Sequence, residues 1–372
     1  MSRLSIAGTL LSAGRELAGT VVVEGEEIVE VVPGRAGREE VDLVHDGFVA
    51  PGLCDLQVNG AAGRSVTQEG SAVPELEGRL LEAGVTSYLP TLVTSPPDLR
   101  VEAIERLAHR ADDPRSPAAG IHLEGPLLNS DMRRVHDERW LEDAVEGLPE
   151  GFEHEAVRLV TLAPEVPGGR GAIRRLAGRG VTVSLGHSAA TAAQALAAAD
   201  AGAGAVTHLF NAMAPLHHRD PGLVGAALAD ERLAPMVIAD GIHVDPVVLA
   251  VVNRAAGDRV VLVSDASPAA GAPEGAHRMQ GIPIERRGEV VTDAEGRLAG
   301  SALLLDRVVR RWREATGCTA AEAWAAGSER PAALIGSASG LAPGRPASLV
   351  LLDWDLAVER VMLRGRWWPS SG

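Results

Sequence analysis

Residues 205–225, AVTHLFNAMAPLHHRDPGLVG, begin as a short apolar run and continue into a loop rich in polar side chains. His208 lies at the end of the run, Asn211-Ala212 follows as a turn, and Arg219 precedes a Pro-Gly pair. Imidazoles bind metal ions, and guanidinium groups bind anions. The stretch therefore predicts a buried strand that delivers two chemically different groups to one loop.

Seven further apolar runs of similar length occur along the chain, and segments of helical length separate most of them. The eight runs are Gly52–Val58, Thr86–Leu92, Gly120–Leu123, Arg158–Leu162, Val181–Leu185, Ala205–Leu209, Met236–Ala239 and Val260–Val263. Strands of a parallel sheet are buried on both faces and alternate with crossover helices. Eight such units predict an α/β fold, a (β/α)8 TIM-like barrel over residues 51–340.

The two ends of the chain carry β-branched runs bounded by turn residues, which are typical of strands. We expect these strands at Leu4–Ile6, Thr20–Val23, Glu27–Val32, Glu40–Leu43, Ser348–Leu352 and Val358–Leu363. Because chain termini often lie close in space, residues 1–50 and 341–372 predict one small β-sandwich domain. Within the barrel, a hairpin insertion is expected near residues 277–298, formed by Glu285–Leu298 and turning at Asp293–Gly296.

Composition excludes several functional classes. A net charge of −15 argues against binding to nucleic acid or to anionic membranes. The chain has no lysine, so a Schiff-base lysine, a P-loop lysine and a carbamylated lysine between two metals are all excluded. Two cysteines, Cys54 and Cys318, form no disulfide framework, and no run has the pattern of a signal peptide or the length of a membrane span. We therefore expect a cytoplasmic protein.

Polar side chains follow several of the apolar runs, and in a barrel such positions meet at the C-terminal mouth. They are Gln57 and Asn59 after the first run, Glu124 after the third, His187 after the fifth, His208 after the sixth and Asp265 after the eighth. A carboxylate with two imidazoles is a usual ligand set for a divalent metal. Asp265 would be costly to bury without a partner, and it suits either a turn cap or a general base.

The best candidate for binding an anion is Arg219, because a guanidinium fork matches phosphate oxygens. The neighbouring His217 and His218 could equally be solvated loop residues. Asn211-Ala212 can offer backbone N–H groups from a turn. His243 follows the seventh run at the same mouth, whereas composition alone marks His136 only as a surface histidine.

Specific motifs recur from end to end of the chain. They are PGLCDLQVNG, HLEGPLLN, SLGHSAAT, THLFNAM followed by RDPGLVGA, IADGIHVD, VLVSDA, LAGSALLLD and LAPGRPASLVLLD. In these motifs and their spacing the chain resembles the N-acetylglucosamine-6-phosphate deacetylases of the amidohydrolase superfamily. The resemblance implies removal of acetyl from N-acetyl-D-glucosamine 6-phosphate in a homodimer.

The resemblance also implies the role of each site residue. Glu124, His187 and His208 would bind one divalent metal ion per subunit, zinc or ferrous iron, and Asp265 would be the general base and acid. His136 would contact the acetamido carbonyl, and His243, in some members of the family, comes from the partner subunit. The implied substrate-binding residues are Val135, His136, Asn211, Ala212, Arg219, His243, Leu298, Ala299 and Gly300.

Two segments of the chain depart from the pattern. Gln57 and Asn59 stand where many amidohydrolases have His-x-His, which favours a single tightly held metal. Whether these carboxamides also contact a second, more weakly bound ion is left open. Arg134 stands two residues before His136, where the family usually has glycine. Alternative functions are action on N-acetylgalactosamine 6-phosphate or N-acyl-D-amino acids, or a non-catalytic sugar-phosphate-binding scaffold.

Overall fold

The structure, a computed structural model, describes residues 3–34, 41–68 and 72–369. Its centre is an eight-stranded parallel sheet whose strands neighbour one another in chain order, as the eight apolar runs predict. The strands are β5 (Leu53–Val58), β8 (Val85–Val93), β9 (Ile121–Glu124), β10 (Val157–Leu162), β11 (Thr182–Leu185), β12 (Ala203–Val206), β13 (Ala234–Val237) and β14 (Val261–Leu262). The predicted barrel is confirmed, and the carboxyl ends of all eight strands point to one mouth.

The barrel closes between β5 and β14 without a regular ladder. Among the described residues, the backbone joins there at the Val58–Ala266 bridge, and the Asn59 and Gly60 N–H groups donate to the Ala266 carbonyl at 2.8 and 3.1 Å. The buried carboxylate of Asp55 accepts the Ser264 N–H at 3.1 Å and also the Ser264 hydroxyl. A side chain therefore completes the seam where strand pairing is missing.

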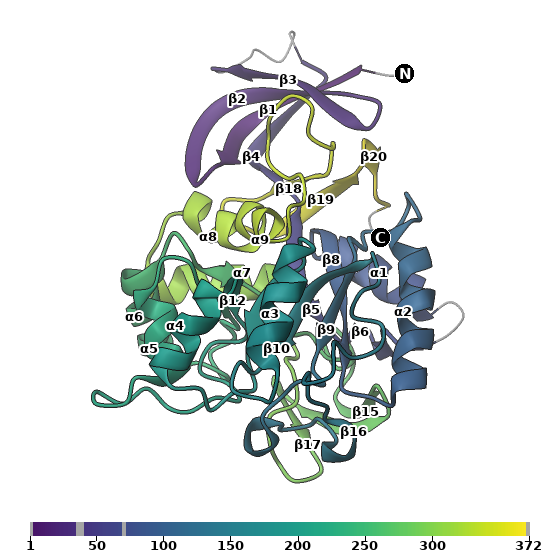
Figure 1. Cartoon of the computed structure of the whole chain (residues 1–372). Helices are drawn as coiled ribbons and strands as arrows, with labels where there is room; N and C mark the ends of the chain where they lie inside the picture. Colours follow the sequence, from purple (N-terminus) through teal and green to yellow (C-terminus); the bar gives the residue numbers. More distant parts are fainter. Residues whose placement is uncertain (1–2, 35–40, 69–71, 370–372) are drawn as a thin grey trace.

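Helices cover the outside of the barrel (Figure 1). Those of the described residues are α1 (Ala72–Glu82), α2 (Pro97–Ala111), α3 (Gly169–Gly178), α4 (Ala192–Asp200), α5 (Gly222–Ala229), α6 (Pro246–Ala256), α7 (Leu305–Thr316), α8 (Ala320–Gly327) and α9 (Glu329–Leu334). Local signals set their ends: Thr191 and Gln194 form a capping box at α4, and Asp245 caps α6. Between β9 and β10 no α-helix forms, and two single turns, Ser130–Met132 and Glu138–Trp140, take its place.

Both chain ends form the expected small β domain. Its seven strands are joined in one continuous sheet in the order β20 (Arg366–Trp367), β19 (Val358–Leu363), β18 (Leu349–Leu352), β4 (Leu43–Pro51), β1 (Arg3–Ser12), β2 (Arg15–Glu24) and β3 (Glu27–Pro33). A core that includes Ile6, Val21, Val49, Leu349 and Met362 comes from both termini. The strand expected at Glu40–Leu43 instead begins at Leu43, and Glu40 lies outside the described residues.

The insertion after β14 is larger than the single hairpin expected. It has three antiparallel strands, β15 (Gly275–Met279), β16 (Ile282–Arg287) and β17 (Val290–Asp293), so it starts before residue 277. The predicted turn at Asp293–Gly296 is present, but it follows β17, and the hairpin turn lies at Gly288. A short hairpin of β6 (Gly60–Ala61) and β7 (Arg64–Ser65) follows β5. The insertion and the small domain lie at opposite ends of the barrel (Figure 1).

Candidate active site

Four of the predicted side chains meet at the mouth of the barrel. Glu124 ends β9, and His187, His208 and Asp265 follow β11, β12 and β14, each within three residues of the strand end. The last three have positive φ angles of 48°, 30° and 48°, a left-handed conformation that non-glycine residues rarely adopt. All four side chains are buried. Backbone strain is therefore concentrated where these groups are aimed into the mouth.

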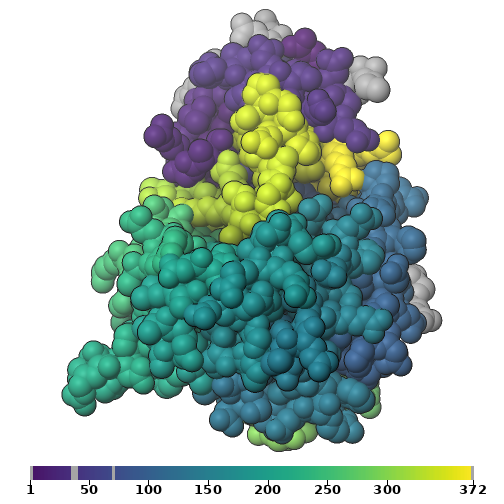
Figure 2. Space-filling view, in the orientation of Figure 1, coloured from purple at the N-terminus to yellow at the C-terminus, as the bar shows by residue number. Residues whose placement is uncertain are grey.

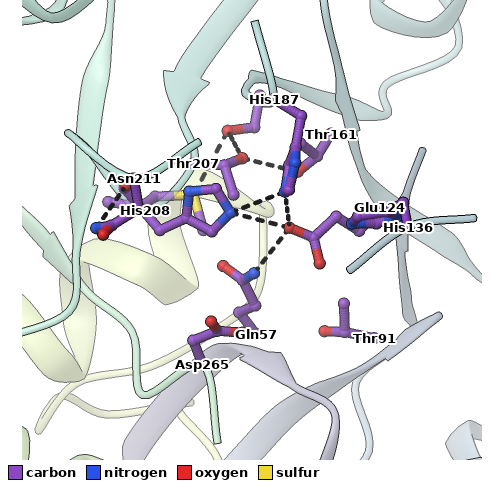
Figure 3. A network of polar contacts seen from close by, with 12 residues as sticks. Gln57, Thr91, Glu124, His136, Thr161, His187, Thr207, His208, Asn211 and Asp265 are labelled. Carbon is purple, nitrogen blue, oxygen red and sulfur yellow. Dashed lines mark hydrogen bonds and ion pairs between the residues drawn. The ribbon is translucent and has the colours of Figure 1, made fainter. Parts of the chain in front are cut away.

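The ligand atoms of Glu124, His187 and His208 converge. Glu124 Oε1 lies 3.1 Å from His187 Nε2 and 3.0 Å from His208 Nε2, and the two Nε2 atoms are 3.2 Å apart (Figure 3). Around a tetrahedral ion with bonds of about 2.0–2.1 Å, ligand atoms stand about 3.3 Å apart. The three atoms thus fit one small divalent cation.

A hydrogen bond prepares the imidazole of His187 for a cation. His187 Nδ1 lies 2.9 Å from the Met132 carbonyl, which can only accept, so the proton is on Nδ1 and Nε2 keeps its lone pair. His208 Nδ1 is buried with no hydrogen-bond partner in the described part of the chain. Two nitrogen atoms and a carboxylate oxygen form a donor set that suits zinc or ferrous iron.

The pKa values of the two buried acids, Glu124 and Asp265, are shifted in opposite directions. Burial alone would raise the pKa of Glu124, but its contacts with His187 and His208 hold this pKa well below its usual range. Burial, followed by the charge of Glu124, raises the pKa of Asp265 to about 8. Two nearby carboxyl groups with separated pKa values are typical of one ligand and one acid–base group.

The two first-strand carboxamides contact these acids. Gln57 Nε2 donates to Glu124 Oε1 at 3.1 Å, and Asn59 Nδ2 donates to Asp265 Oδ1 at 2.9 Å. Gln57 Oε1 is buried and has no hydrogen-bond partner among the described residues. Gln57 and Asn59 therefore lie beside the predicted ligands, with their N–H groups turned toward the acids and one oxygen atom left unpaired.

His136 is buried at the site rather than on the surface. Its ring packs edge-on against that of His187 at 4.5 Å, and it could share a metal ion with Glu124 and His187, since one ligand atom from each lies within 4.8 Å of the others. However, Nδ1 accepts the Thr94 N–H at 3.2 Å, so the proton of the neutral ring is on Nε2. Burial lowers the pKa of His136 to about 3, which keeps the ring neutral. A protonated Nε2 is a hydrogen-bond donor, which suits a carbonyl oxygen better than a metal ion.

A network of buried polar groups lies beside the ligands, and Figure 3 shows two of its members, Thr161 and Thr207, next to His187 and His208. His122 Nδ1 donates to the Leu56 carbonyl at 2.9 Å, so Nε2 accepts the Thr161 hydroxyl at 2.8 Å. Thr207 then donates to Thr161 at 2.7 Å, and Ser184 donates to Thr207 at 2.6 Å. The chain of hydrogen bonds has one direction and leaves none of these buried groups unpaired.

A cavity of about 270 Å³ opens above the ligands. Most of the predicted residues line it: Asn59, Glu124, Val135, His136, His187, His208, Asn211, Ala212, His243, Asp265, Leu298, Ala299 and Gly300. Gly300 has φ +70°, and a Cβ there would stand 2.9 Å from the Asp265 carbonyl, so a glycine is required beside the acid. Gln57 lies beneath the cavity, against Glu124.

Arg219 does not line the cavity of its own chain. It belongs to an exposed loop, residues 215–220, that projects from the body of the molecule (Figure 2), and its guanidinium contacts His218. His243 lines the cavity of its own chain, and its Nδ1 lies 2.7 Å from Asp240 Oδ2. The Asn211 N–H bonds to the His208 carbonyl, so of the expected Asn211-Ala212 pair only the Ala212 N–H is left for a ligand.

Sequence reasoning did not find Gln280, which lies in the β15–β16 turn with φ +51°. Its Nε2 donates to the Thr91 carbonyl at 2.8 Å and to Asn59 Oδ1 at 3.4 Å, while its Oε1 accepts the Val93 N–H at 3.2 Å. Arg134 and Arg297, which also line the cavity, were not predicted to bind substrate. The sequence marks Gln280 only as part of a Gln-Gly turn between two short strands. Nothing in the sequence places that turn against β8.

A parallel barrel with a carboxylate, two imidazoles and a buried aspartate at its mouth defines a class of metal-dependent barrel hydrolases. Residues 48–368 match the profile of the amidohydrolase family, and the chain belongs to that family.

Named relatives of this chain align with most of its length. The chain is 40% identical to the N-acetylglucosamine-6-phosphate deacetylase of Danio rerio, over 86% of this chain and 84% of the relative. It is 38% identical to the N-acetylgalactosamine-6-phosphate deacetylase of Escherichia coli O157:H7, over 91% of both chains. The structure matches, with a TM-score of 0.92 and 30% identity, that of a variant N-acetyl-D-glucosamine-6-phosphate deacetylase from Mycobacterium smegmatis in complex with N-acetyl-D-glucosamine-6-phosphate, and covers 99% of this chain and all of that one.

Proposed function

We propose that this chain is a metal-dependent deacetylase that converts N-acetyl-D-glucosamine 6-phosphate and water to D-glucosamine 6-phosphate and acetate. The observation that carries the proposal is the convergence of Glu124, His187 and His208 beside Asp265 within one cavity. The deacetylases among the relatives agree with it. A non-catalytic scaffold would need neither the ligand set nor a buried acid facing it.

Glu124, His187 and His208 would hold one divalent ion, zinc or ferrous iron. When bound, such an ion supplies Lewis acidity, which lets water be deprotonated near neutral pH and polarises a carbonyl group. Gln57 supports the site by donating to Glu124 Oε1, the oxygen that faces both imidazoles. The remaining chemistry belongs to the side chains around these ligands.

Asp265 acts in its ionised form, and its raised pKa makes it a stronger base, which takes a proton from the attacking water as the new carbon–oxygen bond forms at the amide carbonyl. The Nε2–H of His136 donates to the carbonyl oxygen, where negative charge develops. Asp265 then passes its proton to the amide nitrogen, the carbon–nitrogen bond breaks, and acetate and the amine leave. The Asn59 side-chain N–H donates to Asp265 Oδ1, which orients the carboxylate. Asp265 Oδ2 is therefore available to carry the proton.

The phosphate lies remote from the bond that breaks, so its binding orients the amide rather than activating it. The Ala212 N–H and His243 line the cavity and are available to an anion. We infer that Arg219 acts in a homodimer, where its projecting loop places the guanidinium at the partner's cavity. Leu216 on the same loop is 49% exposed, which suits a surface that is covered in a dimer. A cytoplasmic location remains our expectation.

A substrate panel tests the function. Protein loaded with zinc or ferrous iron is incubated with N-acetylglucosamine 6-phosphate, N-acetylgalactosamine 6-phosphate, unphosphorylated N-acetylglucosamine and an N-acetyl-D-amino acid, and acetate is measured. We expect acetate and amine in equal amounts from the first compound, at a kcat/KM above that of the others. A higher kcat/KM for N-acetylgalactosamine 6-phosphate would make that compound the substrate. One relative of the chain is an N-acetylgalactosamine-6-phosphate deacetylase. Binding of phosphosugar without acetate release would support the scaffold.

A further inference from the structure

Arg134 adopts a costly backbone conformation at the edge of the active-site cavity. It lies in the loop between β9 and β10, two residues before His136, with φ +54°. A residue with a Cβ is disfavoured in this left-handed region, whereas glycine occupies it freely. Arg134 also lines the cavity together with Val135 and His136. The side chain therefore stands at a position where the backbone favours glycine, which indicates that the arginine has a use of its own.

Arg134 is a cation at this cavity that has no partner among the described residues. Among the described residues, the arginines that line the cavity are Arg134 and Arg297. The guanidinium of Arg297 is bound by Asp293 at 2.7 Å and Glu295 at 2.9 Å, so its charge is compensated. In the described part of the chain, Arg134 makes no side-chain hydrogen bond or ion pair. Its neighbour Arg133 bonds to the Ser130 carbonyl and Glu138 instead.

The negative net charge of the chain makes the uncompensated positive charge of Arg134 informative. Acidic groups exceed basic ones by fifteen, so an anionic substrate meets a negative field. Arg219 is outside the cavity of its own chain. A free guanidinium at the cavity edge supplies local positive charge and a planar donor fork that matches phosphate oxygens.

We propose that Arg134 is a specificity-determining residue that binds the phosphate group of the substrate from within the same subunit. This inference rests on the proposed function for the substrate it names. Arg134 and His136 share one short loop, but the buried His136 is held independently by Thr94. The neighbouring residue, Val135, lines the same cavity and separates the two polar contacts.

The test variant is Arg134→Gly, which removes the guanidinium and relieves the left-handed strain. We expect KM for N-acetylglucosamine 6-phosphate to rise on the order of ten-fold or more, as for the loss of a charge-assisted hydrogen bond, with kcat changed by less than about three-fold. The midpoint of thermal unfolding should stay equal or rise, because glycine fits the backbone. Turnover of unphosphorylated N-acetylglucosamine should not change.

Matched variants separate charge from loop structure. Arg133→Gln removes the neighbouring charge, which does not line the cavity, and should leave KM unchanged. Arg134→Lys keeps a charge without the fork and should recover part of the loss in affinity. An equal loss on phosphorylated and unphosphorylated substrates, or an unchanged KM in Arg134→Gly, would overturn the proposal.

Binding measurements distinguish this inference from the proposed function. If wild-type protein deacetylates the phosphosugar but Arg134→Gly does so with unchanged KM, the proposed role of Arg134 is overturned and the proposed function stands. If wild-type protein shows no deacetylation, calorimetric titration of the metal-loaded protein with glucosamine 6-phosphate still decides the role. Affinity that falls at least ten-fold in Arg134→Gly supports it, and equal affinity, or no binding to wild type, overturns it.

Discussion

At the mouth of the barrel the backbone is left-handed at His187, His208 and Asp265, and buried polar groups face one another around a cavity. The opposite end has a smaller cavity of about 150 Å³, lined by residues that include Cys54, Thr86 and Ala332, and apolar packing dominates around it. There Ala332 of α9 and Ile335, the residue after this helix, pack against apolar side chains inside the barrel, including Leu56 and Leu159. The first residue of β11, Thr182, donates to the Leu334 carbonyl and ties α9 to that end.

The difference shows how one set of strands serves two purposes. Apolar packing at the closed end stabilises the strands, and the rigid strands hold strained polar residues at the open end. Changes at the mouth should therefore alter activity more than stability, and changes at the closed end should do the reverse. Five experiments test this division, in order of the expected effect on turnover.

The largest effect should follow Glu124→Gln. The change removes the charge that faces both imidazoles, so the variant should bind zinc far more weakly and lose all measurable turnover. Metal content after gel filtration and acetate release check both results. A variant that keeps its metal and its activity would show that Glu124 is not a ligand.

Asp265→Asn should lower kcat by about 10²–10⁴-fold, because the group that moves the proton is lost. Metal content should stay near that of the wild type. In metal-free protein the midpoint of thermal unfolding at pH 9 should rise, because burial raises the pKa of Asp265 to about 8 and its ionisation is unfavourable in the folded protein. Loss of the metal would instead make Asp265 a ligand.

Gln280→Glu tests whether the insertion orients the acid. The carboxylate cannot donate to Asn59 Oδ1, so the Asn59 amide should rotate and withdraw its N–H from Asp265. We expect kcat to fall about 10-fold, with KM within about 3-fold of the wild type. Arg278→Ala, which alters the same turn at an exposed side chain, is the control and should behave as wild type. Equal losses in both variants would indicate a general effect on the turn.

Arg219→Ala should raise KM for the phosphosugar, and mixing subunits shows whose cavity it serves. Arg219→Ala protein is unfolded and refolded together with Asp265→Asn protein. If Arg219 acts on the partner's cavity, mixed dimers contain one site with both residues intact, and normal KM returns. If it acts in its own chain, no site is complete and KM stays high.

The smallest effect on turnover should follow Leu159→Ala at the closed end. Leu159 is fully buried among apolar side chains, so its truncation should lower the free energy of unfolding by about 2–5 kcal/mol. Turnover per folded molecule should remain within about two-fold of the wild type. Denaturant unfolding and active-site titration measure the two quantities separately. A large loss of kcat would contradict the division between the two ends.

The sequence was sufficient for the barrel and for its inward-facing acids and histidines. Buried parallel strands are continuous apolar runs, and a side chain at the carboxyl end of such a run must face the mouth. Glu124, His187, His208 and Asp265 were predictable for this reason.

Residues on long connections were not predictable in the same way. The distances of Gln280, Arg134 and Arg219 from the cavity depend on how loops fold back, and neither strand nor helix periodicity carries that information. The extent of the insertion was underestimated because β15, with the sequence GAHRM, contains no apolar run.

The seam between β5 and β14 has a consequence for how the molecule opens. Ser264 and Ala266, which flank Asp265, are attached to β5 and the two residues after it through the Asp55 carboxylate and the Asn59 and Gly60 N–H groups. Any fluctuation that parts these two strands displaces the acid before it disturbs the three metal-binding residues. Inactivation should thus precede global unfolding, and amide hydrogen exchange at Ser264 should report it earliest.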